Sequence, residues 1–424
     1  MSHPWWIPPF LGRIPPLEGR QLALLGLVAL ALFFESYDLS MGTSALKHIA
    51  DDLGIAEGDL GGTLGLIRLG AIPAFLLAPF ADRIGRRRVF LACVLAGSAT
   101  TCATALVQST AQYVAMQMLT RTALILGAVV AIVIVAEEFP AASRGWALGM
   151  LGALSACGHG LGALVFAAID HLPYGWRSLY VLGVLSVLFW GRFRDGITET
   201  ARFRSHAARR QSRGTFHDWL RPFVGLLRTH PQRACAMASV ALLLGIGEVS
   251  AFQFTGYFAQ AAHGWSPGQY AAMVLAGGGV GIVGNIVAGR LGDRIGRRRV
   301  GATFLTILPL FAILFYNGPG WTLPIGFAGF VFCATAGDVI VRAFSTELFP
   351  TSHRGTSAGW AQLLQTLGWA VGLGLVGLGT ENVHDLARHT SALACVTIGA
   401  AALLLTLPET HRRELESLSL EEGL

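Results

Sequence analysis

Several acidic and basic residues lie within long apolar runs of this sequence. A charge buried in such a run is costly, so each of these residues suggests a functional role. Glu35 and Asp38 are three positions apart, so they share one face of a helix. Arg121 lies about nine residues into another apolar run, roughly 13 Å deep. Burial favours a neutral carboxyl group and a nearby guanidinium favours a charged one, so an arginine that approaches and withdraws can expel and admit a proton. A static ion pair is the alternative interpretation.

Further charges occupy other apolar runs. Glu248 follows Asp38 by 210 residues, and it is either a second titrating group or a ligand for a cationic substrate. Asp338 and Arg342 are four positions apart on one helix face, which allows a structural ion pair, the favoured interpretation, or a contact with substrate. Arg68 either extends to the membrane surface or attracts an anionic substrate.

Uncharged polar side chains in the same runs complete a candidate binding site. Aromatic and amide groups in apolar helices can hold an organic ring and hydrogen-bond its polar edge. Trp360 and Trp369 are further candidates, although core packing explains a lone tryptophan at least as often. The substrate-binding candidates are Tyr37, Arg68, Gln253, Asn285, Asp338, Arg342, Gln362 and Gln365.

The composition is that of a membrane protein. Apolar residues make up 53% of the 424 and charged residues only 13%, with a mean hydropathy of +0.56. Soluble domains carry about 25% charged residues. The net charge of +6 is therefore no sign of nucleic-acid binding, and the six cysteines lie in apolar runs without metal-ligand spacing. No enzyme motif or ATP-binding string is found, so we expect no cofactor and a proton gradient as the energy source.

Twelve apolar segments are long enough to span a bilayer, which predicts an all-α membrane protein. Arginines cluster before the first segment and in every second connection, while Asp51, Asp52, Glu57 and Asp59 follow the first segment. The positive-inside rule then places both termini on the cytoplasmic side of the membrane. We expect this membrane to be a bacterial-type inner (plasma) membrane. The expected spans are roughly 22–46, 61–81, 89–109, 112–138, 145–169, 177–193, 234–258, 270–292, 300–317, 322–348, 355–379 and 389–407.

A basic stretch between the sixth and seventh spans divides the chain. We expect an N-terminal six-helix half at 1–200, a cytoplasmic linker at 201–233 and a C-terminal half with a short tail at 234–424. We expect a monomer. Its expected partners are the lipid bilayer, protons and a small organic substrate molecule.

Two short strings each occur twice. Residues 82–89 read Asp-Arg-Ile-Gly-Arg-Arg-Arg-Val and return unchanged 211 residues later, at 293–300. The pattern Glu-x-Phe-Pro-x-x-x-Arg-Gly at 137–145 returns 210 residues later, at 347–355. Matching offsets indicate a duplicated membrane unit, which is the architecture of transporters.

These strings resemble signatures of the major facilitator superfamily. The first is similar to the family's connection between helices 2 and 3 and its repeat between helices 8 and 9, and the second to its 4–5 and 10–11 loops. Further similarity at 199–203 and 408–410 is typical of the sugar-porter and organic-ion branches. The resemblance runs from about residue 20 to 413 and implies twelve transmembrane helices in two pseudo-symmetric six-helix halves.

The resemblance also implies roles for individual residues. Asp38 would be the proton site and Arg121 its partner, with Glu35 and Glu248 as further proton-coupling candidates. Asp82 would pair with Arg144 and Glu137 and clamp the two halves in an outward-facing state, and Gly85 and Gly296 permit the tight turns. The candidates for this conformational gate are Asp82, Arg83, Gly85, Arg86, Glu137, Arg144, Asp293, Arg294, Gly296, Arg297, Glu347 and Arg354.

The sequence as a whole favours a secondary transporter. We expect proton-coupled symport of a small organic anion, such as a carboxylate or aromatic acid, by alternating access. Intramembrane arginines favour the anion, and the paired glutamines typical of sugar porters in helix 7 are replaced by Phe252-Gln253. A proton-coupled transporter of sugars or of drugs and other organic cations is the alternative within the class, and a transporter-like membrane nutrient sensor is the alternative outside it.

Overall fold

The computed structural model describes residues 14–200, 225, 227–349 and 354–410, except for the side chains of Asp82, of 141–142 and of 354–356. Helices and short turns make up these residues, and no strand occurs among them. By length and composition, nine helices within this described part could cross a membrane. Two more predicted spans are single helices, and the span predicted at 177–193 is a run of short helices. The all-α prediction is therefore confirmed.

The chain divides into two compact units. Unit 1 consists of residues 1–45 and 70–213, and unit 2 of residues 46–69 and 214–424. The linker predicted at 201–233 lies mostly outside the described residues, so its boundaries stay a prediction. The segment 46–69 clusters with unit 2, although it precedes most of unit 1 in the sequence.

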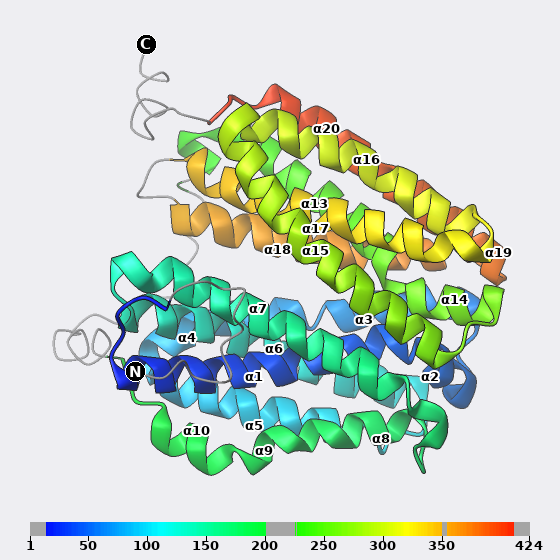
Figure 1. Cartoon of the computed structure of the whole chain (residues 1–424), viewed down its shortest axis with the longest axis horizontal. Helices are drawn as coiled ribbons and strands as arrows, with labels where there is room; N and C mark the ends of the chain where they lie inside the picture. Colours follow the sequence, from blue (N-terminus) through cyan, green and yellow to red (C-terminus); the bar gives the residue numbers. More distant parts are fainter. Residues whose placement is uncertain (1–13, 201–224, 226, 350–353, 411–424) are drawn as a thin grey trace. The chain divides into compact units, whose positions relative to one another are not determined.

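Unit 1 is a helical bundle in which α1 packs against α7 and α5 against α6 (Figure 1). Its core includes Leu25, Val28 and Val130. The last predicted span of this half consists of α8, η3, α9 and α10. The elements of unit 1 are α1 Gly19–Ser44, α4 Ala71–Ile84, α5 Arg86–Thr104, α6 Thr110–Glu138, α7 Ala141–Phe166, η2 Ile169–His171, α8 Trp176–Val181, η3 Leu182–Val184, α9 Leu185–Leu188 and α10 Trp190–Gly196.

Unit 2 contains a corresponding bundle, in which α13 packs against α18 and α16 against α17 (Figure 1). The segment 46–69 adds α2 and α3, and α3 packs along α18. The elements of unit 2 are α2 Leu46–Leu53, α3 Glu57–Arg68, α13 Pro231–Gln253, α14 Thr255–His263, α15 Pro267–Ile295, α16 Arg297–Asn317, η4 Gly320–Thr322, α17 Leu323–Glu347, α18 Arg354–Gly377, α19 Val383–Ala394 and α20 Val396–Thr406.

Glycines let the helices that carry the buried acids approach their neighbours closely in both units. A Cβ atom on Gly158 of α7 would lie 2.0 Å from the carbonyl oxygen of Phe33 on α1. A Cβ atom on Gly245 of α13 would lie 2.2 Å from the carbonyl oxygen of Gln365 on α18. Such backbone contact is the usual way in which membrane helices associate. It fixes α1 and α13, and with them Asp38 and Glu248.

Candidate functional site

The acids of α1 lie inside unit 1. Asp38 is 5% exposed, and its Oδ1 accepts a hydrogen bond from Thr101 Oγ1 at 2.9 Å. Arg121 attracts both Asp38 and Glu35 electrostatically. Within the described residues, however, no ion pair shorter than 4.0 Å joins Arg121 to either carboxylate. In this structure Asp38 accepts its side-chain hydrogen bond from Thr101.

A small cavity of about 40 Å³ lies beside these acids. Its lining includes Glu35, Asp38, Thr101, Ser98 and Ser186, all from unit 1. Since a site needs only about 10–15 Å³ and a few polar partners to hold a water molecule, this cavity has room for water. On the same helix, Tyr37 donates its hydroxyl proton to the Leu179 carbonyl at 2.9 Å, which is a structural contact.

In unit 2, one amide joins two acids. The Nε2 group of Gln365 donates to Glu248 Oε2 at 3.3 Å and to Asp338 Oδ1 at 3.1 Å. Arg342 Nε lies 2.8 Å from Asp338 Oδ2, so the pair expected from their spacing is present. The structure thus brings together four candidates from three helices, α13, α17 and α18.

Arg68 lies in a second polar contact of unit 2. Its guanidinium donates to Gln253 Oε1 at 2.6 Å and lies 5.2 Å from the centre of the Trp369 ring, within cation–π range. Gln253 is buried and Arg68 is half-buried. Gln362 is half-buried on α18, and Asn285 is exposed on α15.

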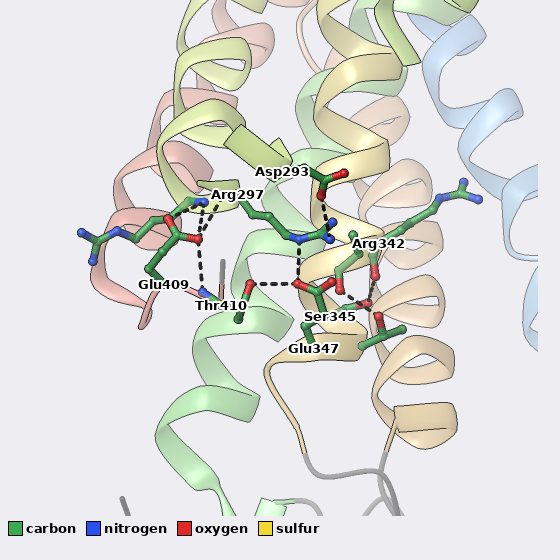
Figure 2. Close-up of polar contacts among 10 residues, drawn as sticks. Asp293, Arg297, Arg342, Ser345, Glu347, Glu409 and Thr410 are labelled. Carbon is green, nitrogen blue, oxygen red and sulfur yellow. Dashed lines mark hydrogen bonds and ion pairs between the residues drawn. The ribbon is translucent and has the colours of Figure 1, made fainter. Parts of the chain in front are cut away.

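A polar network surrounds the turn between α15 and α16 (Figure 2). Gly296 has a φ of +113°, and the Glu409 carboxylate accepts hydrogen bonds from the backbone N–H groups of Arg297 at 2.9 Å and Arg298 at 3.2 Å. The carboxylate therefore caps the start of α16, where unpaired N–H groups favour negative charge. Glu347 Oε2 lies 2.7 Å from Arg297 Nε and accepts a hydrogen bond from Thr410 Oγ1 at 2.9 Å.

Unit 1 repeats this network around Gly85, whose φ is also +113°. Glu199 Oε1 accepts from the Arg86 backbone N–H at 3.0 Å and so caps α5. Glu137 pairs with the Arg86 guanidinium at 3.0 Å and accepts from Thr200 Oγ1 at 2.6 Å. The same residue pairs meet in both copies, although Glu137 contacts a terminal guanidinium nitrogen of Arg86 and Glu347 contacts Nε of Arg297.

The pairing expected of Asp82 with Arg144 and Glu137 stays a prediction, because the side chain of Asp82 is not described. Glu137 pairs with Arg86, and the Arg144 guanidinium donates to the Phe139 carbonyl at 3.3 Å. In the second copy, Asp293 contacts Arg297 at 3.3 Å. Arg83 and Arg294 are exposed. The side chains of Asp82 and Arg354 lie outside the described residues.

The sequence interpretation missed four members of these networks as site residues, Glu199, Thr200, Glu409 and Thr410. Their signal was present, because Glu409 and Thr410 follow Glu199 and Thr200 by 210 residues, the offset of the repeated strings. Thr101 was also missed, since one threonine in an apolar run has no distinguishing pattern.

Paired bundles with buried acids and repeated turn networks are the features of a membrane transporter. The sequence profile of the Major Facilitator Superfamily matches residues 28–420, and the chain belongs to that superfamily. A gallate transporter of Pseudomonas putida is 26% identical, covering 92% of this chain and 94% of its own length. A cis,cis-muconate transport protein of Acinetobacter baylyi is 26% identical, covering 82% and 85%.

Solved structures agree on the fold. A bacterial homologue of the human lysosomal transporter Spinster has a TM-score of 0.78 at 16% identity, covering 96% of this chain and 99% of its own. The predictions of a twelve-helix fold, of the superfamily and of a transporter rather than an enzyme are therefore confirmed.

Proposed function

We propose that this transporter carries a small organic carboxylate, aromatic acids included, together with protons across a bacterial inner membrane. The observation that carries the proposal is the two polar contacts of unit 2, in which Arg68 is paired with the amide of Gln253, and Arg342 with Asp338, an acceptor of the Gln365 amide. Guanidinium groups are suited to binding carboxylates. Gallate and muconate, the substrates named for two relatives, are both carboxylates.

Proton coupling is assigned to Asp38. Its hydrogen bond from Thr101 stabilises the charged form, and the adjacent cavity has room for water that could deliver a proton. When Arg121 approaches, its charge favours release of the proton, and when it withdraws, a neutral Asp38 is favoured. The exchange of partners between Thr101 and Arg121 would then accompany the conformational cycle.

The two turn networks are assigned to the cytoplasmic gate. In each copy the same geometry, an arginine paired with a glutamate and a capped helix start, holds three segments together. These contacts are charged and lie near the helix ends, so water can replace them when the segments separate. Alternating access would break and remake them once in each cycle.

Uptake into proteoliposomes under an imposed pH gradient tests the proposal. Labelled gallate and a panel of benzoates should accumulate in vesicles that contain the purified protein, and Asp38→Asn should abolish accumulation while exchange of substrate continues. Asp195→Asn, which removes an exposed carboxylate of α10, is the matched control and should leave uptake unchanged. Gradient-driven accumulation by Asp38→Asn would reject the assignment of the proton site.

A further inference from the structure

The sixth span of unit 1 carries charges that its repeat partner lacks. The seven residues of α10 include three charged ones, Arg192, Arg194 and Asp195. The positions that follow them by 210 residues belong to α20, which contains no charged residue. Arg192 falls within the span expected at 177–193, where a charge is costly and usually functional. The repeated fold therefore does not account for this arginine.

Arg192 is the charge of α10 that is left for a ligand. Arg194 and Asp195 form an ion pair with each other, in which Arg194 Nε lies 3.0 Å from Asp195 Oδ1. The Arg192 guanidinium lies 5.8 Å from the centre of the Phe189 ring, and among the residues that the structure describes no carboxylate approaches it within 4.0 Å. Arg192 is also exposed, so an anion from outside the protein can reach it.

A groove of about 800 Å³ lies beside Arg192, between α1 and α10, which are neighbours in unit 1 (Figure 1). One wall is formed by α1 from Leu22 to Phe33. Apart from two charged residues of α10, the lining is apolar. Gly191 leaves the other wall open, since a Cβ atom there would meet nothing within 4 Å. The volume lies within the range of about 300–1,000 Å³ that is usual for ligand pockets.

The length of the groove matches one leaflet of a bilayer. The helical stretch from Leu22 to Phe33 is about 16 Å long, about half of the roughly 30 Å of hydrocarbon in a bilayer. Leu22 lies three residues after the start of α1 at Gly19, on the side that the arginine distribution assigns to the cytoplasm. Anionic lipids of the cytoplasmic leaflet attract arginine side chains near the membrane surface.

We propose that this groove binds a phospholipid with an anionic headgroup from the cytoplasmic leaflet. An acyl chain lies along α1 in the apolar part of the groove. The Arg192 side chain extends toward the membrane surface and exchanges the ring of Phe189 for the lipid phosphate, with which a guanidinium forms charge-assisted hydrogen bonds. The site belongs to the first half of the chain alone, because α20 has no corresponding arginine. It does not depend on the proposed substrate.

Titration of the purified, delipidated protein with lipid tests the headgroup. Dioleoylphosphatidylglycerol should raise the Tm with a midpoint concentration about fivefold lower than that of dioleoylphosphatidylcholine, the equivalent of about 1 kcal/mol. Arg192→Gln should remove this preference. Arg88→Gln is the matched control, since Arg88 is an exposed arginine of α5 outside the groove, and it should keep the preference. An equal loss in both variants would overturn the site, because the overall charge would then attract the lipid.

A substitution that fills the groove tests the place of the acyl chain. Gly191→Leu should raise the midpoint for both lipids about tenfold, because its side chain displaces about two methylene groups of the lipid. Gly152→Leu on α7 is the control, since its Cβ position is equally open but lies outside the groove, and it should change neither midpoint. Unchanged midpoints in Gly191→Leu would overturn the proposal. So would a lipid-dependent rise in Tm that appears only after residues 1–13 are removed, because that segment would then be the occupant of the groove.

Discussion

The close contact between α1 and α7 predicts that Gly158→Ala is strongly destabilising. A Cβ atom at this position would lie 2.0 Å from the Phe33 carbonyl oxygen and 2.9 Å from its carbonyl carbon. Both atoms belong to the backbone of α1, so no side chain can turn away to make room. The helices must move apart, and Glu35 and Asp38, within two turns of Phe33, must move with α1.

The size of the effect follows from a comparison within the same helix. Overpacking of this kind costs about 1–3 kcal/mol. At Gly152 a Cβ atom meets nothing within 4 Å, so Gly152→Ala should stabilise the protein by about 0.4–1 kcal/mol through the unfolded state. The gain through the unfolded state applies to both variants, so they should differ by the overpacking cost alone, about 1–3 kcal/mol, or about 2–12 °C in Tm for a unit of this size.

Thermal unfolding of the purified protein in detergent measures this difference, and proteoliposome uptake measures its consequence for function. Gly158→Ala should lower the uptake rate by a larger factor than it lowers the amount of folded protein, because it displaces the buried acids. Gly245→Ala should behave in the same way in unit 2, where the corresponding distance is 2.2 Å. Equal Tm values for Gly158→Ala and Gly152→Ala would refute the reasoning.

Two further predictions concern single hydrogen-bonding groups. Glu199→Gln and Glu409→Gln should each lower the free energy of unfolding by about 1 kcal/mol, because each removes the negative charge that caps a helix start. A loss in only one of the two copies, measured by thermal unfolding, would contradict the equivalence of the networks. Thr101→Val should impair gradient-driven uptake because Asp38 loses its donor, whereas Thr101→Ser keeps the hydroxyl and should retain uptake. Similar uptake by both variants would show that this hydrogen bond has no role in coupling.

The membrane helices and the duplication could be predicted from the sequence because both leave local signals. Apolar runs mark the spans, and strings such as 82–89 and 293–300 mark the repeat. The sixth span is less regular than predicted. Gly183 packs so closely against Thr101 that a Cβ atom would lie 2.4 Å from its methyl group, within a segment of short helices. The hydropathy of a sequence indicates the length of such a segment but not the points at which its helix is interrupted.

Tertiary partners could not be predicted in the same way. Glu199 caps a helix that begins more than 100 residues earlier, and only the folded chain brings the two together. The Asp338–Arg342 contact was predictable because its spacing lies within one helix. Gln365, by contrast, joins Glu248 to Asp338 across three helices. The glycines of α3 were visible in the sequence, but their pairing with α18 was not.

The second acid, Glu248, leads to a prediction about the charge moved in each cycle. A monocarboxylate that enters with one proton carries no net charge, so the membrane potential does not drive it. If Glu248 carries a second proton in addition to that of Asp38, the cycle moves one positive charge. A potential of 100 mV then contributes about 2.3 kcal/mol, which raises accumulation about 50-fold.

Proteoliposomes with a potassium diffusion potential measure this dependence at fixed pH. The wild-type protein should accumulate more substrate as the inside becomes more negative, and Glu248→Gln should abolish this response. The variant should still show a tenfold rise in accumulation for each unit of pH gradient, because the proton at Asp38 remains. The amide of Gln365 contacts Glu248 at 3.3 Å and is retained, so the substitution changes charge with little change in shape. Wild-type uptake that is insensitive to potential would mean that Glu248 carries no coupling proton.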